Sequence, residues 1–173
     1  MPKHLWVKYF LAATVVIVIA LFAYHNRPYD FKTPTTEQLA KAFPGQSRDI
    51  LENSQQFTLY SLDASNVPQE KETFRGWGVL GKTEVSDPKV RRLLIRSLYD
   101  SIARGGWQAS CFVPHHAIHA VRAGESVDVI ICFHCGQVAV VSGGQDATAT
   151  ITHDPPPAFD QVLTQAGIPL GRR

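Results

Sequence analysis

Residues 111–141, CFVPHHAIHAVRAGESVDVIICFHCGQVAVV, decide the fold of this chain. Within this stretch, short runs rich in valine and isoleucine alternate with brief turn segments. Runs of this length joined by short turns form antiparallel sheets, because a parallel connection needs a dozen or more residues. The stretch therefore predicts three antiparallel strands, over residues 117–122, 127–133 and 137–142.

The same pattern continues on both sides of this stretch. Residues 88–104 carry apolar side chains four positions apart, after Asp87 as an N-cap and before Gly105-Gly106 as a stop, which predicts one clear helix. A short last helix is expected over 158–166, and further strands over 57–62, 73–85, 107–113 and 147–152. The predicted fold class is α+β, an antiparallel β-sheet of about five to seven strands with one main amphipathic helix packed on it.

An apolar segment lies near the N-terminus, at residues 5–24, LWVKYFLAATVVIVIALFAY, where Lys8 carries the only charge. A helix of this length rises about 30 Å, which matches the hydrocarbon thickness of a bilayer. We therefore expect residues 1–24 to be an uncleaved, single-pass transmembrane anchor. A cleaved signal peptide is the alternative, but residues 24–28, YHNRP, contain no small-x-small cleavage site.

The charges that flank this segment nearly balance, since Lys3 and Lys8 lie at its start and Arg27 and Lys32 follow it. A short N-terminal tail before a first span usually stays inside. We therefore expect the globular domain to face the extracytoplasmic side.

Two further segments are expected after the anchor. Residues 25–54 are predicted to be a stalk with short helices over 36–43 and 48–53, the first of them opened by a capping box. Residues 55–173 are predicted to be a single α+β globular domain.

The composition argues against one class of partner. The chain has 17 lysines and arginines against 15 aspartates and glutamates, a net charge of +2. No basic tract interleaved with aromatic residues occurs, so the electrostatic footprint of a nucleic-acid-binding protein is missing. We expect the membrane, through residues 5–24, to be a partner and nucleic acid not to be one; the protein partner is unknown.

The residues able to carry chemistry are clustered. All three cysteines and four of the seven histidines fall between positions 111 and 135: Cys111, His115, His116, His119, Cys132, His134 and Cys135. A two-residue turn at Gly124-Glu125 would place His119, Asp128 and Cys132 on one face of a hairpin, with His119 diagonal to the other two. Asp128 lies within an apolar run and needs a partner, for which His119 is the nearest candidate.

The motif resembles the signature of a family of uncharacterised bacterial proteins, Cys-Phe-x-Pro-Arg-His-Gly followed by Asp-x-x-Ile-Cys-Phe-x-Cys. The matching positions are Cys111, Phe112, Pro114 and His116, then Asp128, Ile131, Cys132, Phe133 and Cys135. His115 and Ala117 stand where that signature has arginine and glycine. The family has no established activity, so the resemblance implies a fold but no function.

Four interpretations of the cluster stay open. Cys132 to Gly136 has the C-x-x-C-G form of a zinc knuckle, and Cys111 and His116 would complete a tetrahedral ligand set with Cys132 and Cys135. Alternatively, Cys111 forms a disulfide with Cys132 or Cys135, which an extracytoplasmic domain permits. The third interpretation makes these residues buried packing groups, and the fourth makes Cys132, His119 and Asp128 a catalytic group.

The function expected from these features is not enzymatic. The chain is predicted to be a membrane-anchored binding or accessory module whose Cys/His cluster is stabilised by zinc or by a disulfide. The alternative is a membrane-bound thiol- or metal-dependent enzyme that uses the same cluster. A cleft where His116, His119 and Cys132 converge would favour the enzyme, whereas a closed and buried cluster would favour the structural role.

Overall fold

The computed structural model describes residues 31–63, 72–154 and 156–171. The predicted anchor at residues 5–24 lies outside this part of the chain, within which no helix is both long and apolar enough to cross a membrane. The elements in chain order are α2 (Thr36–Ala42), α3 (Ser47–Glu52), β1 (Gln56–Asp63), β2 (Thr73–Phe74), β3 (Trp77–Glu84), α4 (Pro88–Arg104), β4 (His116–Arg122), β5 (Glu125–Cys132), β6 (Gln137–Ser142), β7 (Gln145–Thr150) and α5 (Pro157–Gln165).

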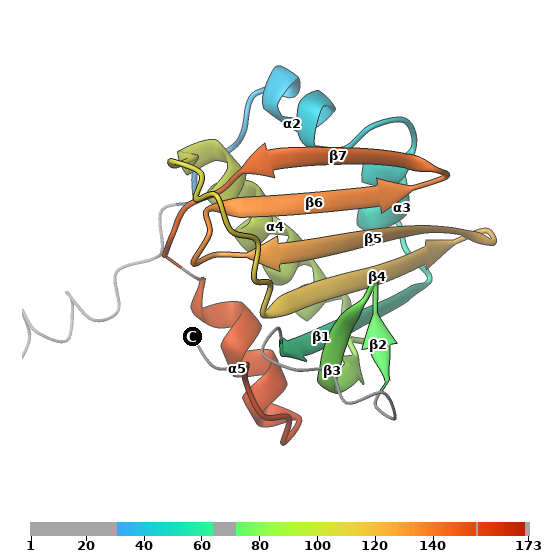
Figure 1. The fold of residues 1–173 in the computed structure, drawn as a ribbon. Coiled ribbons are helices and arrows are strands. Elements are labelled where there is room, and N and C mark those ends of the chain that lie inside the picture. The colour runs from blue at the N-terminus through green and yellow to red at the C-terminus, as the bar shows by residue number, and fades with distance from the viewer. Residues whose placement is uncertain (1–30, 64–71, 155, 172–173) are drawn as a thin grey trace, which may run out of the picture. The chain divides into compact units, whose positions relative to one another are not determined.

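The strands form one curled antiparallel sheet in the order β2-β3-β1-β4-β5-β6-β7 (Figure 1). Strands β4 to β7 follow one another through tight turns, as short connections require. β1 pairs with both β3 and β4, so β3 and β4 run in the same direction on its two sides. A connection between strands of the same direction must cross the sheet, and α4 makes that crossing. The predicted α+β class and antiparallel sheet are confirmed.

Helix α4 begins and ends where the sequence predicts. The Asp87 carboxylate accepts a hydrogen bond from the Lys89 amide, and Gly105 ends the helix with a φ of 61°, a backbone conformation that favours glycine. Its apolar stripe, represented by Leu94 and Leu98, is fully buried in the main core against one face of the sheet.

Helices α2 and α3 also belong to the main core. The capping box that opens α2 is present, with Thr35 and Gln38 bonded reciprocally. Leu39, Ile50 and Leu51 are buried in the core, so residues 36–52 pack within the compact unit that begins at Phe31. The sequence predicts a stalk with short helices over residues 25–54, because helices of about two turns are too short to show an apolar period.

Two predicted strands differ from the structure. Residues 107–113 form an irregular segment, and residues 73–85 form a hairpin of β2 and β3 instead of one strand. The hairpin turns at Arg75-Gly76, where both residues have positive φ. An arginine in that conformation gives no turn signal in the sequence, whereas Asn-Gly or Gly-Gly would have done so.

The sheet face opposite the main core carries a second, smaller apolar cluster, and we call it the open face. Tyr60, Ala117 and Ile130 are buried there because Phe74 and Trp77 of the β2–β3 hairpin and Phe112 of the irregular segment pack on them. In Figure 1, α4 lies behind the sheet and the irregular segment crosses in front of it. The open face is therefore covered by a hairpin and a loop at its margins.

Candidate functional site

The β4–β5 hairpin determines which candidate residues meet. Its turn is Ala123-Gly124, with φ of 50° and 84°, and not Gly124-Glu125 as predicted. The pairing is therefore displaced by two positions from the predicted register, and His119 lies directly opposite Asp128. A shift of the register by an even number of residues leaves every side chain on the same face of the sheet. The prediction that His119 and Asp128 share a face is confirmed for this reason.

Asp128, His119 and Arg75 form a polar group on the open face, which we call the Asp128 cluster. One carboxylate oxygen of Asp128 lies 2.6 Å from His119 Nδ1, and the other lies 2.6 Å from Arg75 Nε and 2.5 Å from Nη2. The Asp128 side chain is 6% exposed, while those of His119 and Arg75 are 34% and 47% exposed. A buried carboxylate is thus neutralised by two donors that reach the surface.

Aromatic rings surround the Asp128 cluster. The Phe74 ring meets the His119 imidazole edge-on at 6.4 Å and stacks on Tyr60 at 4.5 Å. The Lys82 ammonium lies 5.8 Å from the centre of the Tyr60 ring, and burial raises the pKa of the Tyr60 phenol. Because an ionised carboxylate only accepts, His119 Nδ1 carries the proton in this pair. The other ring nitrogen, Nε2, has no hydrogen-bond partner among the described residues.

The cysteines are arranged differently from the expected disulfide. Cys132 and Cys135 are bonded to each other, with α-carbons 5.2 Å apart and both residues buried, and Cys111 is free and exposed. The sequence instead predicts a disulfide that joins Cys111 to Cys132 or to Cys135. The tight turn between β5 and β6 brings positions 132 and 135 side by side, whereas Cys111 lies in the irregular segment and faces solvent.

The irregular segment is held against this disulfide by several polar contacts. The Val113 amide donates to Cys135 Sγ at 3.1 Å, and the Val113 carbonyl oxygen lies 3.0 Å from Cys132 Sγ. The Ala109 amide donates to the Cys135 carbonyl at 3.0 Å, and the Gln137 side chain donates to the Ala109 carbonyl at 2.6 Å. These contacts close the cysteine end of the sheet from solvent.

His116 points to the other face of the sheet. It pairs with Ile131 of the main core, and its ring lies between Phe133 and Phe159, with Nε2 2.9 Å from an Asp160 carboxylate oxygen. The side chain is buried, and no hydrogen-bond partner for Nδ1 is present among the described residues. His116 therefore attaches α5 to the sheet, far from the face that carries His119.

The predicted zinc ligands are Cys111, His116, Cys132 and Cys135. In the described part of the chain, no group of three or more His, Cys, Asp or Glu side chains is arranged to hold a metal ion. Zinc would need the thiolates of Cys132 and Cys135, which the disulfide removes. Zinc at these residues stays a prediction.

Sequence reasoning missed Arg75 and the ring of Phe74 beside it. Arg75 reaches Asp128, and Phe74 reaches His119, from β2–β3, which is separated from β5 in the sheet by β1 and β4. The only signal in the sequence was Asp128 itself, a charged residue within an apolar run. A single partner, the partly exposed His119, would leave its carboxylate incompletely paired, which indicates a second partner.

No protein-family model, curated protein or solved structure matches this chain.

Proposed function

We propose that this protein is a membrane-anchored binding module, with residues 5–24 as a single-pass anchor and the globular domain on the extracytoplasmic side. The Cys132–Cys135 disulfide supports that side, because structural disulfides form and persist in oxidising compartments. The residues that begin the compact unit follow the apolar segment after a short connection, which suits a domain held close to a bilayer.

One observation carries the non-enzymatic function. The residues that an enzyme would have to bring together diverge, because His116 faces the main core while His119 faces the open side of the sheet. Cys132 is buried and oxidised, so it offers no nucleophilic thiolate. A closed sulfur pair of this kind favours a structural role for the cysteines.

The open face supplies the binding surface of this proposal. It combines partly buried aromatic rings, Phe74 and Trp77, with the half-exposed guanidinium of Arg75 and imidazole of His119. Aromatic and arginine side chains in partly desolvated surroundings are the residues that dominate protein–protein binding energy. The proposed partner is therefore another protein.

Two measurements test the anchor and the cysteine role. The full chain, expressed with residues 1–30, should resist carbonate extraction from membranes. Under non-reducing denaturation it should show one reactive thiol, at Cys111. Extraction into the soluble fraction would overturn the anchor, and one zinc per chain with three reactive thiols would overturn the disulfide role.

A third measurement tests the binding face. A photo-crosslinking amino acid at Asp146, which lies in the same cross-strand row as Asp128, should yield an adduct with one protein in native membranes. The adduct should disappear in R75E and persist in K89E, which changes an exposed charge on α4, on the other face of the sheet. An adduct insensitive to R75E, or turnover of a substrate that depends on His119, would contradict the binding function.

A further inference from the structure

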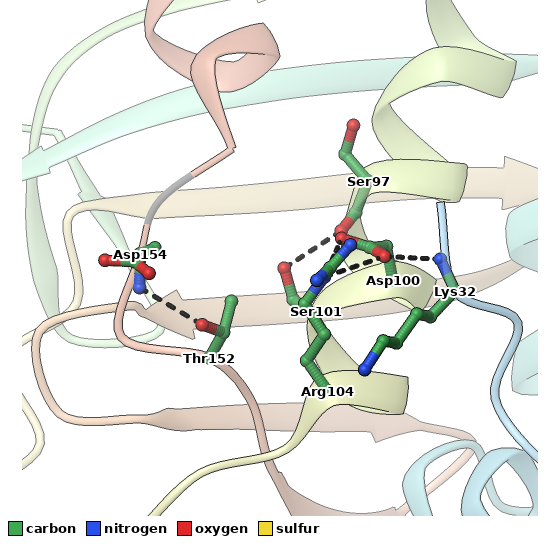
Figure 2. A network of polar contacts seen from close by, with 7 residues as sticks. All are labelled: Lys32, Ser97, Asp100, Ser101, Arg104, Thr152 and Asp154. Atoms are coloured by element: carbon green, nitrogen blue, oxygen red, sulfur yellow. Dashed lines mark hydrogen bonds and ion pairs between the residues drawn. The ribbon is translucent and has the colours of Figure 1, made fainter. Parts of the chain in front are cut away.

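The first described residues of the compact unit are fixed to α4. The Lys32 backbone amide donates to the Asp100 carboxylate at 2.6 Å, and Arg104 Nε donates to both oxygens of the same carboxylate at 3.0 and 2.9 Å (Figure 2). Asp100 is fully buried, so these contacts hold a charge that water does not reach. Next to them, the Arg96 guanidinium lies 4.3 Å from the centre of the Phe31 ring.

A groove of about 490 Å³ opens at this place, and we call it the basic groove. Three cationic side chains line it, those of Lys32, Arg92 and Arg96, and Ile95 and Tyr99 provide an apolar wall. The amide of Lys32 makes the bond to Asp100, and its side chain extends away from that carboxylate (Figure 2). Arg92 and Arg96 are exposed and one helical turn apart, so their charges act on the same space.

One acidic residue also lines the basic groove, but its charge is already engaged. The Glu52 carboxylate accepts a 2.8 Å hydrogen bond from Arg48 and another of 2.8 Å from the Tyr99 hydroxyl. The groove therefore keeps a positive balance beside an apolar wall. A phosphate next to a glycerol and acyl chain has the complementary character.

We infer that the basic groove binds the anionic phospholipid headgroups of the bilayer in which residues 5–24 are anchored. Six residues separate Tyr24 from Phe31, so the seven steps between these α-carbons span at most about 25 Å when fully extended. The chain emerges from the domain beside Arg96, so this short connection keeps the groove, and not a distant surface, within reach of the headgroups. The inference rests on the proposed anchor.

Because the domain is tethered to the bilayer, individually weak contacts with headgroups are sufficient to dock it on the surface. A domain confined near the surface meets headgroups at a high effective concentration, so binding becomes an intramolecular equilibrium between docked and undocked states. Each basic residue near an anionic surface shifts such an equilibrium by roughly fivefold. Two arginines on one helix face would then change the docked-to-undocked ratio by about 30-fold.

The test uses the full chain in nanodiscs of phosphatidylcholine, with or without phosphatidylglycerol. A fluorophore is attached through L93C in a C111S background, because Leu93 is exposed beside Arg92 on α4. A lipid with a nitroxide on its headgroup quenches the fluorophore only at short range. We expect quenching at position 93 with phosphatidylglycerol and little without it, and none at a control label attached through D146C.

Charge variants give the quantitative result. R92Q/R96Q should lower the docked-to-undocked ratio by about 30-fold and R92E/R96E by more. The matched variant K82Q/R122Q removes the same charge from other surfaces and should change the ratio by less than about fivefold. Circular dichroism before reconstitution checks that the variants fold.

The failures of the anchor and of the groove are distinguishable. Loss of the wild-type chain from the nanodiscs overturns the proposed anchor. Retention with equal quenching in both lipid mixtures, or with no effect of R92Q/R96Q, overturns the inference and leaves the anchor standing. Release of quenching by inorganic phosphate, beyond that of sodium chloride at equal ionic strength, also overturns it, since the groove would then bind free phosphate.

Discussion

His119 on β4 and Asp128 on β5 lie directly opposite each other, and their side chains meet on the open face with Nδ1 2.6 Å from Oδ1. Arg75 contacts the second carboxylate oxygen from β2–β3. The carboxylate is nearly buried, whereas both of its partners reach solvent. This difference in exposure makes the energetics of the cluster asymmetric.

Removing both partners of Asp128 should lower the free energy of unfolding more than removing the Asp128 carboxylate does. In R75A/H119A, Asp128 stays buried without a partner, and we expect a loss of about 3–5 kcal/mol in the free energy of unfolding. D128A leaves two groups that water can solvate, and the expected loss is about 1–2 kcal/mol. Urea unfolding monitored by circular dichroism measures both values.

The control for this comparison is K82A, which removes an exposed ion pair with Glu72 on the same sheet. Its effect should be small beside those of the other two variants, because water and salt screen an exposed ion pair. A D128A variant as unstable as R75A/H119A would show that the carboxylate itself, and not its neutralisation, holds the cluster together.

The contrast between His119 and Arg75 shows how far the sequence can predict this site. The pairing of His119 with Asp128 follows from the alternation of faces along two adjacent strands, and an error of two positions in the register leaves it intact. Arg75 is 53 residues from Asp128 in the sequence. It lies at the first position of a turn that has neither glycine nor asparagine there to indicate the turn. Local sequence patterns do not predict a contact between residues so far apart in the chain.

The same distinction holds for the fold. Helix α4 and most strands were predictable because each has a period, a cap or a terminating glycine of its own. The packing of α2 and α3 in the core was not predictable, because their few buried side chains can be recognised as core residues only once the sheet is known.

The disulfide should contribute modestly to stability and hold the irregular segment. Cys132 and Cys135 close a loop of only three residue steps, for which loop entropy predicts about 2 kcal/mol. C132S/C135S should lose about this amount and show faster hydrogen exchange at the amides of Ala109 and Val113. C111S is the matched control and should change the free energy of unfolding by less than about 0.5 kcal/mol. Equal destabilisation by C111S would place Cys111 in a disulfide instead.

Gly136 should be far less replaceable than Gly143, although both have a left-handed backbone, with φ of 65° and 57°. A β-carbon at Gly136 would lie 2.3 Å from the Trp107 carbonyl oxygen and 2.7 Å from His153 Nε2, whereas one at Gly143 would meet nothing within 4 Å. G143A should therefore cost about 1–2 kcal/mol, the strain of the backbone conformation alone.

G136A adds a steric conflict with a backbone atom to the same strain. We expect it to lower the free energy of unfolding by at least about 2 kcal/mol more than G143A does. Chemical unfolding of the two variants gives the difference directly. Equal effects would mean that the Trp107 segment is free to move away from the turn between β5 and β6.

Tyr99 should make the protein less stable in alkali. Its hydroxyl donates to the Glu52 carboxylate at 2.8 Å, and burial, followed by this hydrogen bond, raises the pKa of the phenol well above its usual range. The folded state therefore prefers the protonated phenol. The stabilisation is fully present below the pKa of unfolded tyrosine, about 10, and is lost as the pH rises from there through the folded pKa.

Y99F removes this linkage because phenylalanine does not ionise. Between pH 8 and pH 11, wild-type protein should lose about 1 kcal/mol more of its free energy of unfolding than Y99F does. At pH 8 the variant should itself be less stable by about 1 kcal/mol, the value of the lost hydrogen bond. Because burial also raises the pKa of Tyr60, Y60F should reduce the alkaline loss in the same direction. Parallel pH profiles of wild type and Y99F would mean that the Tyr99 hydroxyl is solvated and unbonded, and that the wall it forms in the basic groove is open to water.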